Sequence, residues 1–174
     1  MTLAELWELF PIILAEHNPH WREQYALEAA LLSKAMRGVE FHHIGSTAID
    51  GIMAKPIVDI LAIAPLDTDL HALAREATAM GYIVMSSSDR RISLNKGYTE
   101  RGFADEVFHL HLRYSGDDDE IYFCAYLNAH ADVAASYEAL KLSLCEKYKH
   151  DRDGYTQAKS DFVRKYTAIA RGER

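Results

Sequence analysis

The chain has 174 residues, of which 49% are hydrophobic and 26% are charged, a composition typical of globular proteins with a sizeable core. This length favours a single domain over residues 1–174, with a sheet body over about residues 10–115 and a helical part over about residues 120–171. The formal net charge of −7 repels polyphosphate backbones, so we expect no nucleic-acid partner.

The beginning of the chain and its cysteines bear on where the protein works. The first ten residues, MTLAELWELF, are acidic where a signal peptide is basic, and charged residues or proline interrupt the apolar stretches before they reach the roughly 18 residues of a membrane span. Cys124 and Cys145 show neither C-x-x-C spacing nor the cysteine density of secreted proteins, so we expect buried thiols. We therefore expect a cytoplasmic protein without a membrane partner.

Helical and strand patterns alternate along the first two thirds of the chain, and helical patterns fill the rest. Apolar residues at helical spacing predict helices at about residues 18–37, 67–80, 121–130, 132–148 and 155–170. Short β-branched or alternating runs predict strands at residues 39–44, 56–64, 82–85 and 108–114. Residues 86–106 are polar and irregular, with at most a short strand at residues 91–95. Asp67 or Thr68 is the expected cap of the second helix. The mixed order predicts an α+β fold.

The last predicted strand places two histidines on one face of the sheet. Because side chains alternate along a strand, His109, His111 and Arg113 share a face. The opposite face consists of Phe108, Leu110, Leu112 and Tyr114. Two imidazoles about 7 Å apart can close on one metal ion or one phosphate. The alternative is a solvated polar face whose histidines are incidental.

Asp59 is the single charge in an apolar strand whose two faces both read as buried. An isolated buried carboxylate would cost several kcal/mol, so Asp59 must be paired, hydrogen-bonded or bound to a metal. A salt bridge to Lys55 or Arg113, or a place at the strand end that water reaches, would satisfy it without any function.

Gly45, Ser46 and Thr47 directly follow the first predicted strand. Glycine permits close approach to the backbone, and successive N–H groups with two hydroxyls can hold phosphate oxygens. As an isolated tripeptide, this pattern is more often a plain turn. Its interest comes from Asp59, thirteen residues beyond Ser46, because two strands can bring phosphate donors and a carboxylate to one edge of the sheet.

The segment HHIGSTAIDGIMAKPIVDILA resembles the GrpB family, whose members look like nucleotidyltransferases and share a Gly-Ser, spacer, Lys-Pro, Asp core. The resemblance extends to the HLH strand, to the Asn-Pro-His-Trp sequence at residues 18–21, and to Tyr137, Lys141, Tyr148, Asp151, Arg152, Tyr155 and Lys159. It implies a nucleotidyltransferase-like fold, with a small mixed sheet backed by helices and the site at the sheet edge. A similar domain occurs fused to dephospho-coenzyme A kinase, which points to nucleotide or coenzyme A metabolism.

Two departures from the nucleotidyltransferase pattern bear on the chemistry. Such enzymes carry a second carboxylate two residues after the first to hold paired magnesium ions, but that position here is Leu61. The imidazoles of His109 and His111 favour a transition metal such as zinc or manganese over magnesium. The chain also has Cys124-Ala125 where the family typically has an Arg-Asp pair, which removes two charges that a phosphate site could use.

These residues receive the following roles as hypotheses. Asp59, His109 and His111 bind a divalent metal, and His43 is either a fourth ligand or a packed histidine bonded to a backbone carbonyl. Asp59 and Lys55 are the expected catalytic residues. A phosphorylated ligand, with a nucleoside triphosphate as one candidate, is expected to contact Gly45, Ser46, Thr47, Arg113, Lys141 and Lys159.

Three functions are compatible with this site. The first is a metal-dependent nucleotidyl or phosphoryl transferase that acts on a nucleotide or small molecule. The second is a module of the same fold that binds a nucleotide or metabolite without turnover. The third is an adaptor that docks through the acidic run Asp117–Glu120, although such runs are more often solvated loops that cap the next helix.

Overall fold

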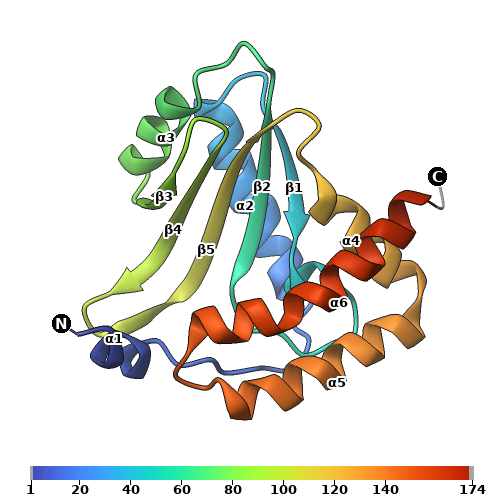
Figure 1. Cartoon of the computed structure of the whole chain (residues 1–174). Coiled ribbons are helices and arrows are strands. Elements are labelled where there is room, and N and C mark those ends of the chain that lie inside the picture. Colours follow the sequence, from blue (N-terminus) through green and yellow to red (C-terminus); the bar gives the residue numbers. More distant parts are fainter. Residues whose placement is uncertain (1, 173–174) are drawn as a thin grey trace.

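A computed structural model describes residues 2–172 and contains one five-stranded mixed sheet with helices on both faces (Figure 1). The strands are β1 (Glu40–Ile44), β2 (Val58–Ala64), β3 (Ile83–Ser87), β4 (Arg91–Thr99) and β5 (Gly102–Tyr114). Their order is β1-β2-β5-β4-β3, and β2 and β5 are parallel while the other neighbours are antiparallel. The predicted α+β fold with a small mixed sheet is confirmed.

The helices divide between the two faces of this sheet. They are α1 (Leu3–Leu9), α2 (His20–Ala35), α3 (Leu70–Ala79), α4 (Asp119–Ala129), α5 (Ala131–Lys147) and α6 (Arg152–Gly172), with a short 3-10 helix, η1 (Ser46–Ala48). Helices α2 and α3 cover one face, and α4, α5 and α6 lie on the other, where α6 crosses in front of the sheet (Figure 1).

Strand β2 is buried on both of its faces, as its apolar sequence predicts. Ile60 packs with Leu32 and Leu110 in the core under α2 and α3, whereas Leu61 packs with Phe123 in the core under α4 and α5. Ile60 and Leu61 are both fully buried, and burial of each side chain contributes about 1.5–3 kcal/mol to the free energy of unfolding. The strand that carries Asp59 is therefore held rigidly between two cores.

The segment predicted to be irregular, residues 86–106, is mostly regular strand, so that prediction is wrong. Strands β4 and β5 form a long hairpin through it, and a register shift lies between Lys96 and Tyr98. Gly97 has φ +93°, and a Cβ atom there would lie 2.3 Å from the Glu106 carbonyl oxygen, so the bulge requires glycine. Residues 103–106 are all exposed, so they lack the alternation of buried and exposed residues that marks a half-buried strand.

The helix ends also differ from the predicted ones. The cap of α3 is Asp69, whose carboxylate accepts a hydrogen bond from the backbone N–H of His71, rather than Asp67 or Thr68. Helix α6 begins at Arg152, three residues before the predicted start at Tyr155. Helix α1 was not predicted at all. These shifts matter at α6, because the added turn carries Arg152 into the site described below.

Of the two cysteines predicted to be buried, one is buried and the other is partly exposed. Cys124 is buried as predicted, while Cys145 is partly exposed. The Cys124 thiol donates to the carbonyl of Gly45, which places it directly behind the Gly45-Ser46-Thr47 turn. No helix within residues 2–172 is long and apolar enough to cross a membrane.

Candidate functional site

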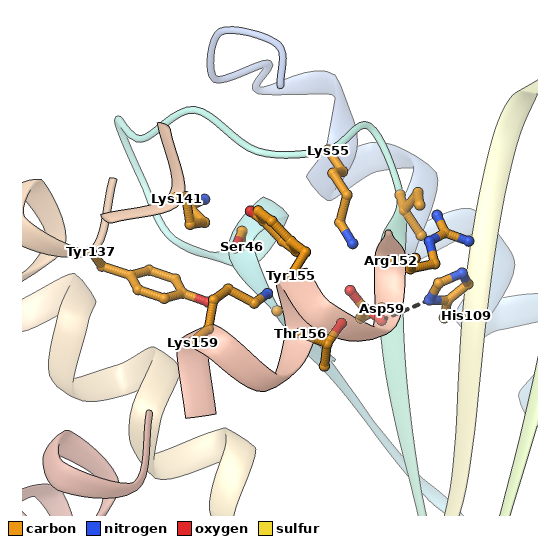
Figure 2. Close-up of a pocket in the computed structure, with 12 residues that line it drawn as sticks. Ser46, Lys55, Asp59, His109, Tyr137, Lys141, Arg152, Tyr155, Thr156 and Lys159 are labelled. Atoms are coloured by element: carbon orange, nitrogen blue, oxygen red, sulfur yellow. Dashed lines mark ion pairs between the residues drawn. The ribbon is translucent and has the colours of Figure 1, made fainter. Parts of the chain in front are cut away.

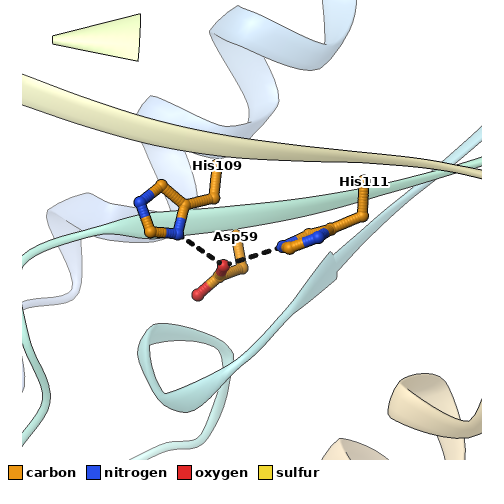
Figure 3. Close-up of side chains that lie close together, drawn as sticks. All are labelled: Asp59, His109 and His111. Carbon is orange, nitrogen blue, oxygen red and sulfur yellow. Dashed lines mark hydrogen bonds and ion pairs between the residues drawn. The ribbon is translucent and has the colours of Figure 1, made fainter. Parts of the chain in front are cut away.

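Asp59 and the two histidines of β5 form one cluster on the face of the sheet that α4, α5 and α6 cover (Figure 3). Asp59 is the register partner of His109 on the neighbouring parallel strand, and His111 lies two residues farther along the same face. The Asp59 Oδ1 atom is 3.4 Å from His109 Nδ1 and 3.1 Å from His111 Nε2. The acid and both imidazoles that the sequence singled out are therefore brought together.

The protonation of this cluster suits metal binding. Burial opposes ionisation of Asp59, but hydrogen bonds and charge from His109 and His111 outweigh it and hold the pKa of the carboxyl below its usual value. Burial lowers the pKa of His109, although Asp59 opposes that shift. At neutral pH the site presents a carboxylate and a neutral His109 imidazole, the forms in which these groups ligate metals.

The three side chains of this cluster are close enough together to hold one divalent metal ion. Tetrahedral coordination with bonds of about 2.0–2.1 Å places neighbouring ligand atoms about 3.3 Å apart. The three candidate ligand atoms lie within 4.8 Å of one another, and 26% of the Asp59 side chain is exposed, so an ion can enter with little movement. One oxygen and two nitrogen donors suit zinc or manganese better than magnesium, which prefers oxygen.

Gly45 is required by the close approach of its turn to Asp59. Its φ is +74°, and a Cβ atom built on it would lie 2.5 Å from the Asp59 Oδ2 atom. Any side chain at this position would displace the carboxylate. The Gly-Ser turn therefore lies directly against the candidate metal ligand, as the strand order at the sheet edge predicts.

Tyr98 links the histidine cluster to α6. Its hydroxyl lies 2.8 Å from His109 Nε2, and Arg152 Nη1 donates to the same hydroxyl at 2.6 Å. The guanidinium can only donate, so the Tyr98 oxygen accepts from Arg152, and its second lone pair can accept from a His109 Nε2–H. In that tautomer His109 Nδ1 keeps a free lone pair on the side of Asp59, and Tyr98 fixes the ring orientation.

A cavity of about 250 Å³ opens over the cluster between the sheet edge and helices α5 and α6 (Figure 2). Its lining residues are Gly45, Ser46, Lys55, Ile57, Asp59, His109, Tyr137, Lys141, Arg152, Tyr155, Thr156 and Lys159. Four of these are lysine or arginine, and Asp59 is the one acid among the lining residues that the structure describes. A chain with net charge −7 thus gathers cations at one cavity.

The cations in this cavity are crowded. Burial, together with the charges of Lys159 and Arg152, lowers the pKa of Lys55 to about 7, while Asp59 opposes the shift. Burial and Lys159 likewise lower the pKa of Lys141 to about 7. Figure 2 shows Lys55 and Lys159 pointing into the cavity from opposite sides. An anion placed between them would relieve this repulsion.

Several buried donors at the cavity lack a partner among residues 2–172. They are the Nε and Nη2 atoms of Arg152 and the hydroxyl of Tyr155, whose residue is fully buried. Leaving a buried donor unsatisfied costs about 1–3 kcal/mol. These groups therefore point to a polar ligand with acceptor atoms.

Two predicted site residues, His43 and Thr47, lie away from the cavity. His43 pairs in register with Ile60, so it faces α2, where its ring stacks on Tyr25 at 4.9 Å. Its Nε2 atom lies 2.9 Å from the hydroxyl of Thr47, which is buried. Burial lowers the pKa of His43 to about 4. The alternative of a packed histidine describes His43 better than a metal ligand does, although its partner is a hydroxyl.

Arg113 is also outside the cavity. Its guanidinium forms ion pairs with Asp117 at 3.2 Å and Glu120 at 3.0 Å. The rest of the acidic run is also paired, since Arg91 binds Asp117 and Arg171 binds Asp118 and Asp119. The salt-bridge alternative for Asp59 is not met by Arg113, because the ion-pair partners of Asp59 are the two histidines.

Of the predicted ligand-binding residues, Gly45, Ser46, Lys55, Lys141 and Lys159 do line the cavity. Lys141 has a second contact, since it is buried and its ammonium donates to the carbonyl of Met53. This bond holds the loop before Lys55 and uses one of the three donors of Lys141.

Sequence reasoning assigned no role to four lining residues of the helical part. Tyr137 lies one turn before Lys141 on α5, and Arg152, Tyr155 and Thr156 precede Lys159 on α6. Spacings of three, four and seven residues place each set on one helix face. A search for lysine or arginine with tyrosine at those spacings would have found all of them except Thr156.

Comparison with known proteins places the chain among GrpB sequences. A model of the GrpB protein family matches residues 11–168. The glutamate-rich protein GrpB of Alkalihalophilus pseudofirmus is 33% identical over 164 residues, which span 87% of this chain and 91% of the relative. A UPF0157 protein of Pseudomonas aeruginosa is 31% identical over 84% of this chain and 62% of its own length.

Solved structures share the fold. The crystal structure of GrpB from Enterococcus faecalis matches with a TM-score of 0.78 and 28% identity, covering 91% of this chain and 96% of that one. The Cid1 poly(U) polymerase, crystallised with MgGTP bound, matches with a TM-score of 0.52 and 15% identity over 84% of this chain and 46% of its own. At that identity the likeness to Cid1 concerns the fold alone.

Proposed function

The chain belongs to the GrpB family, and on that basis we propose that it is a metal-dependent nucleotidyl or phosphoryl transferase acting on a nucleotide or a phosphorylated small molecule. One observation carries this proposal. The cavity with four cationic side chains and unpartnered donors opens directly onto Asp59 and His109 of the candidate metal cluster.

The charges select a ligand with more than one phosphate. A single phosphate monoester carries about −1.5 to −2 charge at neutral pH, so one phosphate alone cannot balance four cations. Arg152 and Tyr155 offer donors for phosphate oxygens, and Lys55 and Lys159 supply charge from either side. The enclosed cavity and the net charge of −7 favour a small molecule over a nucleic acid.

Each group then has a defined task in the transfer. Asp59, His109 and His111 would hold the metal ion, which would supply polarisation of a phosphoryl oxygen. Lys55 and Arg152 flank Asp59, where they would neutralise charge that develops as the acceptor oxygen bonds to phosphorus and loses its proton to water. The bond that breaks is the one to pyrophosphate in nucleotidyl transfer, or to the nucleoside diphosphate in phosphoryl transfer. Tyr98 orients His109, and Gly45 leaves space for the carboxylate.

A binding module without turnover is the second candidate, and Leu61 favours it. The position two residues after Asp59 is fully buried among apolar side chains, where a transferase of this fold usually has a second carboxylate. One carboxylate and two imidazoles can hold a metal and a phosphorylated ligand without orienting an acceptor in line.

Turnover of labelled ATP separates these two candidates. We would incubate the full chain with ATP and manganese or zinc, in the presence of small hydroxyl and amine acceptors, and follow release of pyrophosphate, the product of nucleotidyl transfer, and of ADP, the product of phosphoryl transfer. The transferase predicts release that Asp59→Asn abolishes and that His43→Ala retains. Tight ATP binding with release no greater than that of Asp59→Asn would support the binding module. Absence of both binding and release would refute the proposal.

A further inference from the structure

A second, apolar hollow of about 170 Å³ adjoins the cationic cavity. It is lined by Pro11, Ile13, Lys55, Pro56, Ile57, Phe103, Ala104, Asp105, Val107 and Arg152. Lys55, Ile57 and Arg152 border both spaces. Lys55 and Arg152 each have an apolar stem and a charged end, so one side chain can border an apolar hollow and a phosphate site at once.

The walls of this hollow are held in place without a ligand. The backbone of Ala15 exchanges two hydrogen bonds with Ala54, at 2.8 and 3.0 Å, and Ile12 donates to the Lys149 carbonyl. These bonds fix the strand-like segment that carries Ile13. Phe103 packs at 4.9 Å from Phe10 and 5.1 Å from Tyr98. The hollow is thus preformed, which lowers the entropic cost of binding.

The exposed surface of the hollow is apolar and aromatic. Ile13 is 59% exposed and Phe103 is 37% exposed, and both belong to the same hollow. The Arg152 guanidinium lies over the rings of Tyr98 and Phe103, at 5.5 and 5.8 Å. A planar guanidinium that stacks on rings on one side offers a second planar surface to a ligand. Exposed apolar groups gathered beside a polar cavity are typical of a binding site.

Asp105 determines which kind of ligand group this hollow can bind. It is the acidic residue among the described residues that line the space, and its negative charge disfavours another phosphate there. A carboxylate accepts hydrogen bonds from ring or amino N–H groups. Adenine, guanine and cytosine carry such amino donors on a flat ring. The occupant that fits is therefore a nucleobase.

We infer that the ligand of this protein is a nucleotide whose phosphates occupy the cationic cavity and whose base occupies the hollow between Ile13, Phe103 and Asp105. This inference rests on the proposed function, decides between its two substrate classes in favour of the nucleotide, and assigns a place to the base. It assigns a specificity role to Ile13 and Phe103, two residues outside the catalytic cluster and outside the cationic cavity.

Calorimetric titration with matched triphosphates tests the inference. Methyl triphosphate and ATP carry the same ester-linked triphosphate, and ATP adds the nucleoside. We expect the wild-type chain to bind ATP about tenfold more tightly, the factor that burial of about 60 Å² of apolar ring surface gives. Ile13→Trp, which fills the hollow, and Phe103→Ala, which removes a wall, should each abolish this difference and leave methyl triphosphate affinity unchanged.

Leu66→Trp is the matched control, because Leu66 is an exposed apolar residue, 71% accessible, that lines neither space. It should keep the preference for ATP. Should Phe103→Ala fail to fold, Ile13→Trp decides the question, since Ile13 is largely exposed. Equal affinities in the wild type, or a preference that survives Ile13→Trp, would overturn the inference while the proposed function stands. Failure to bind either triphosphate would remove both.

Discussion

Two groups of buried polar side chains, one on each face of the sheet, differ in whether all their members have partners. On the face under α2 and α3, Glu28 is buried, but it accepts hydrogen bonds from the Tyr82 hydroxyl and the Lys96 ammonium, both at 2.8 Å. On the face under α5 and α6, like charges crowd one cavity, and the Nε and Nη2 atoms of Arg152 and the Tyr155 hydroxyl have no partner within residues 2–172. Paired charge is structural, whereas unpaired buried charge indicates a ligand.

The largest expected effect is on metal content. Asp59→Asn replaces the carboxylate of the cluster with a neutral amide, a much weaker metal ligand, so zinc or manganese affinity should fall by about a hundredfold or more. Elemental analysis after dialysis against dilute metal checks this. His43→Ala is the control, because His43 lies on the other face and should leave metal content unchanged. Equal metal in Asp59→Asn and the wild type would refute the cluster as a metal site.

Removing one cavity cation should weaken polyphosphate binding without weakening the fold. Lys159→Met should reduce affinity for tripolyphosphate by about 10- to 100-fold, because a charge-assisted contact contributes about 1.5–3 kcal/mol. The melting temperature of the free protein should stay the same or rise, since Lys159 lowers the pKa of both Lys55 and Lys141 by repulsion. A lower melting temperature with unchanged affinity would show that the cation is structural.

Removing Lys96, which pairs with Glu28, should destabilise the fold and leave polyphosphate binding unchanged. Lys96→Met leaves Glu28 buried with only the Tyr82 hydroxyl, which should cost about 2 kcal/mol of unfolding free energy. This loss of unfolding free energy is smaller than the loss usual on breaking a fully buried ion pair, because the Lys96 side chain is 30% exposed. Urea denaturation measures the loss, and tripolyphosphate affinity should not change. Weakened tripolyphosphate binding in this variant would erase the contrast between the faces.

A smaller effect is expected from pH. Lys55 and Lys141, with pKa values of about 7 in the free protein, must be charged to hold phosphates. Between pH 7 and pH 8 affinity should fall by at most about fivefold per lysine, as the protonated fraction drops from about a half to about a tenth. Binding should take up protons, which calorimetry in buffers of different ionisation heat detects. Proton release on binding above pH 7 would contradict this assignment.

The same pKa values affect the stability of the free protein with a defined sign. Between about pH 7 and the ordinary lysine pKa of 10.5, the unfolded chain binds more protons at these positions than the folded chain does. Unfolding free energy from Lys55 and Lys141 should therefore rise with pH across that window, and bound polyphosphate should remove the rise.

Local pattern was enough to predict the centre of the site. Alternation along β5 put His109 and His111 on one face, and the apolar surroundings of Asp59 required a partner for it. The Gly45 turn was predicted from its place directly after β1. The positions of His109, His111 and Asp59 depend on strand periodicity, which can be read directly from the sequence.

The parts of the site and fold that the sequence did not predict depend on how helices and strands pack against one another. The face on which His43 lies is set by the register of β1 against β2, which pairs Ile44 rather than His43 with Asp59. Arg152 and Tyr155 reach the cavity because α6 crosses the sheet and begins one turn early. The β4–β5 hairpin was missed because its exposed residues carry no apolar alternation. Such features are fixed by tertiary contacts and leave little trace in one sequence.

The central claim is that the Asp59 cluster and the cationic cavity form one site for a metal and a polyphosphate. Titration of tripolyphosphate into the protein with and without manganese tests it most directly. We predict that the metal tightens binding by about tenfold in the wild type and has no effect in Asp59→Asn, as coupling between adjoining ligands requires. The same affinity with and without manganese in the wild type would contradict the claim.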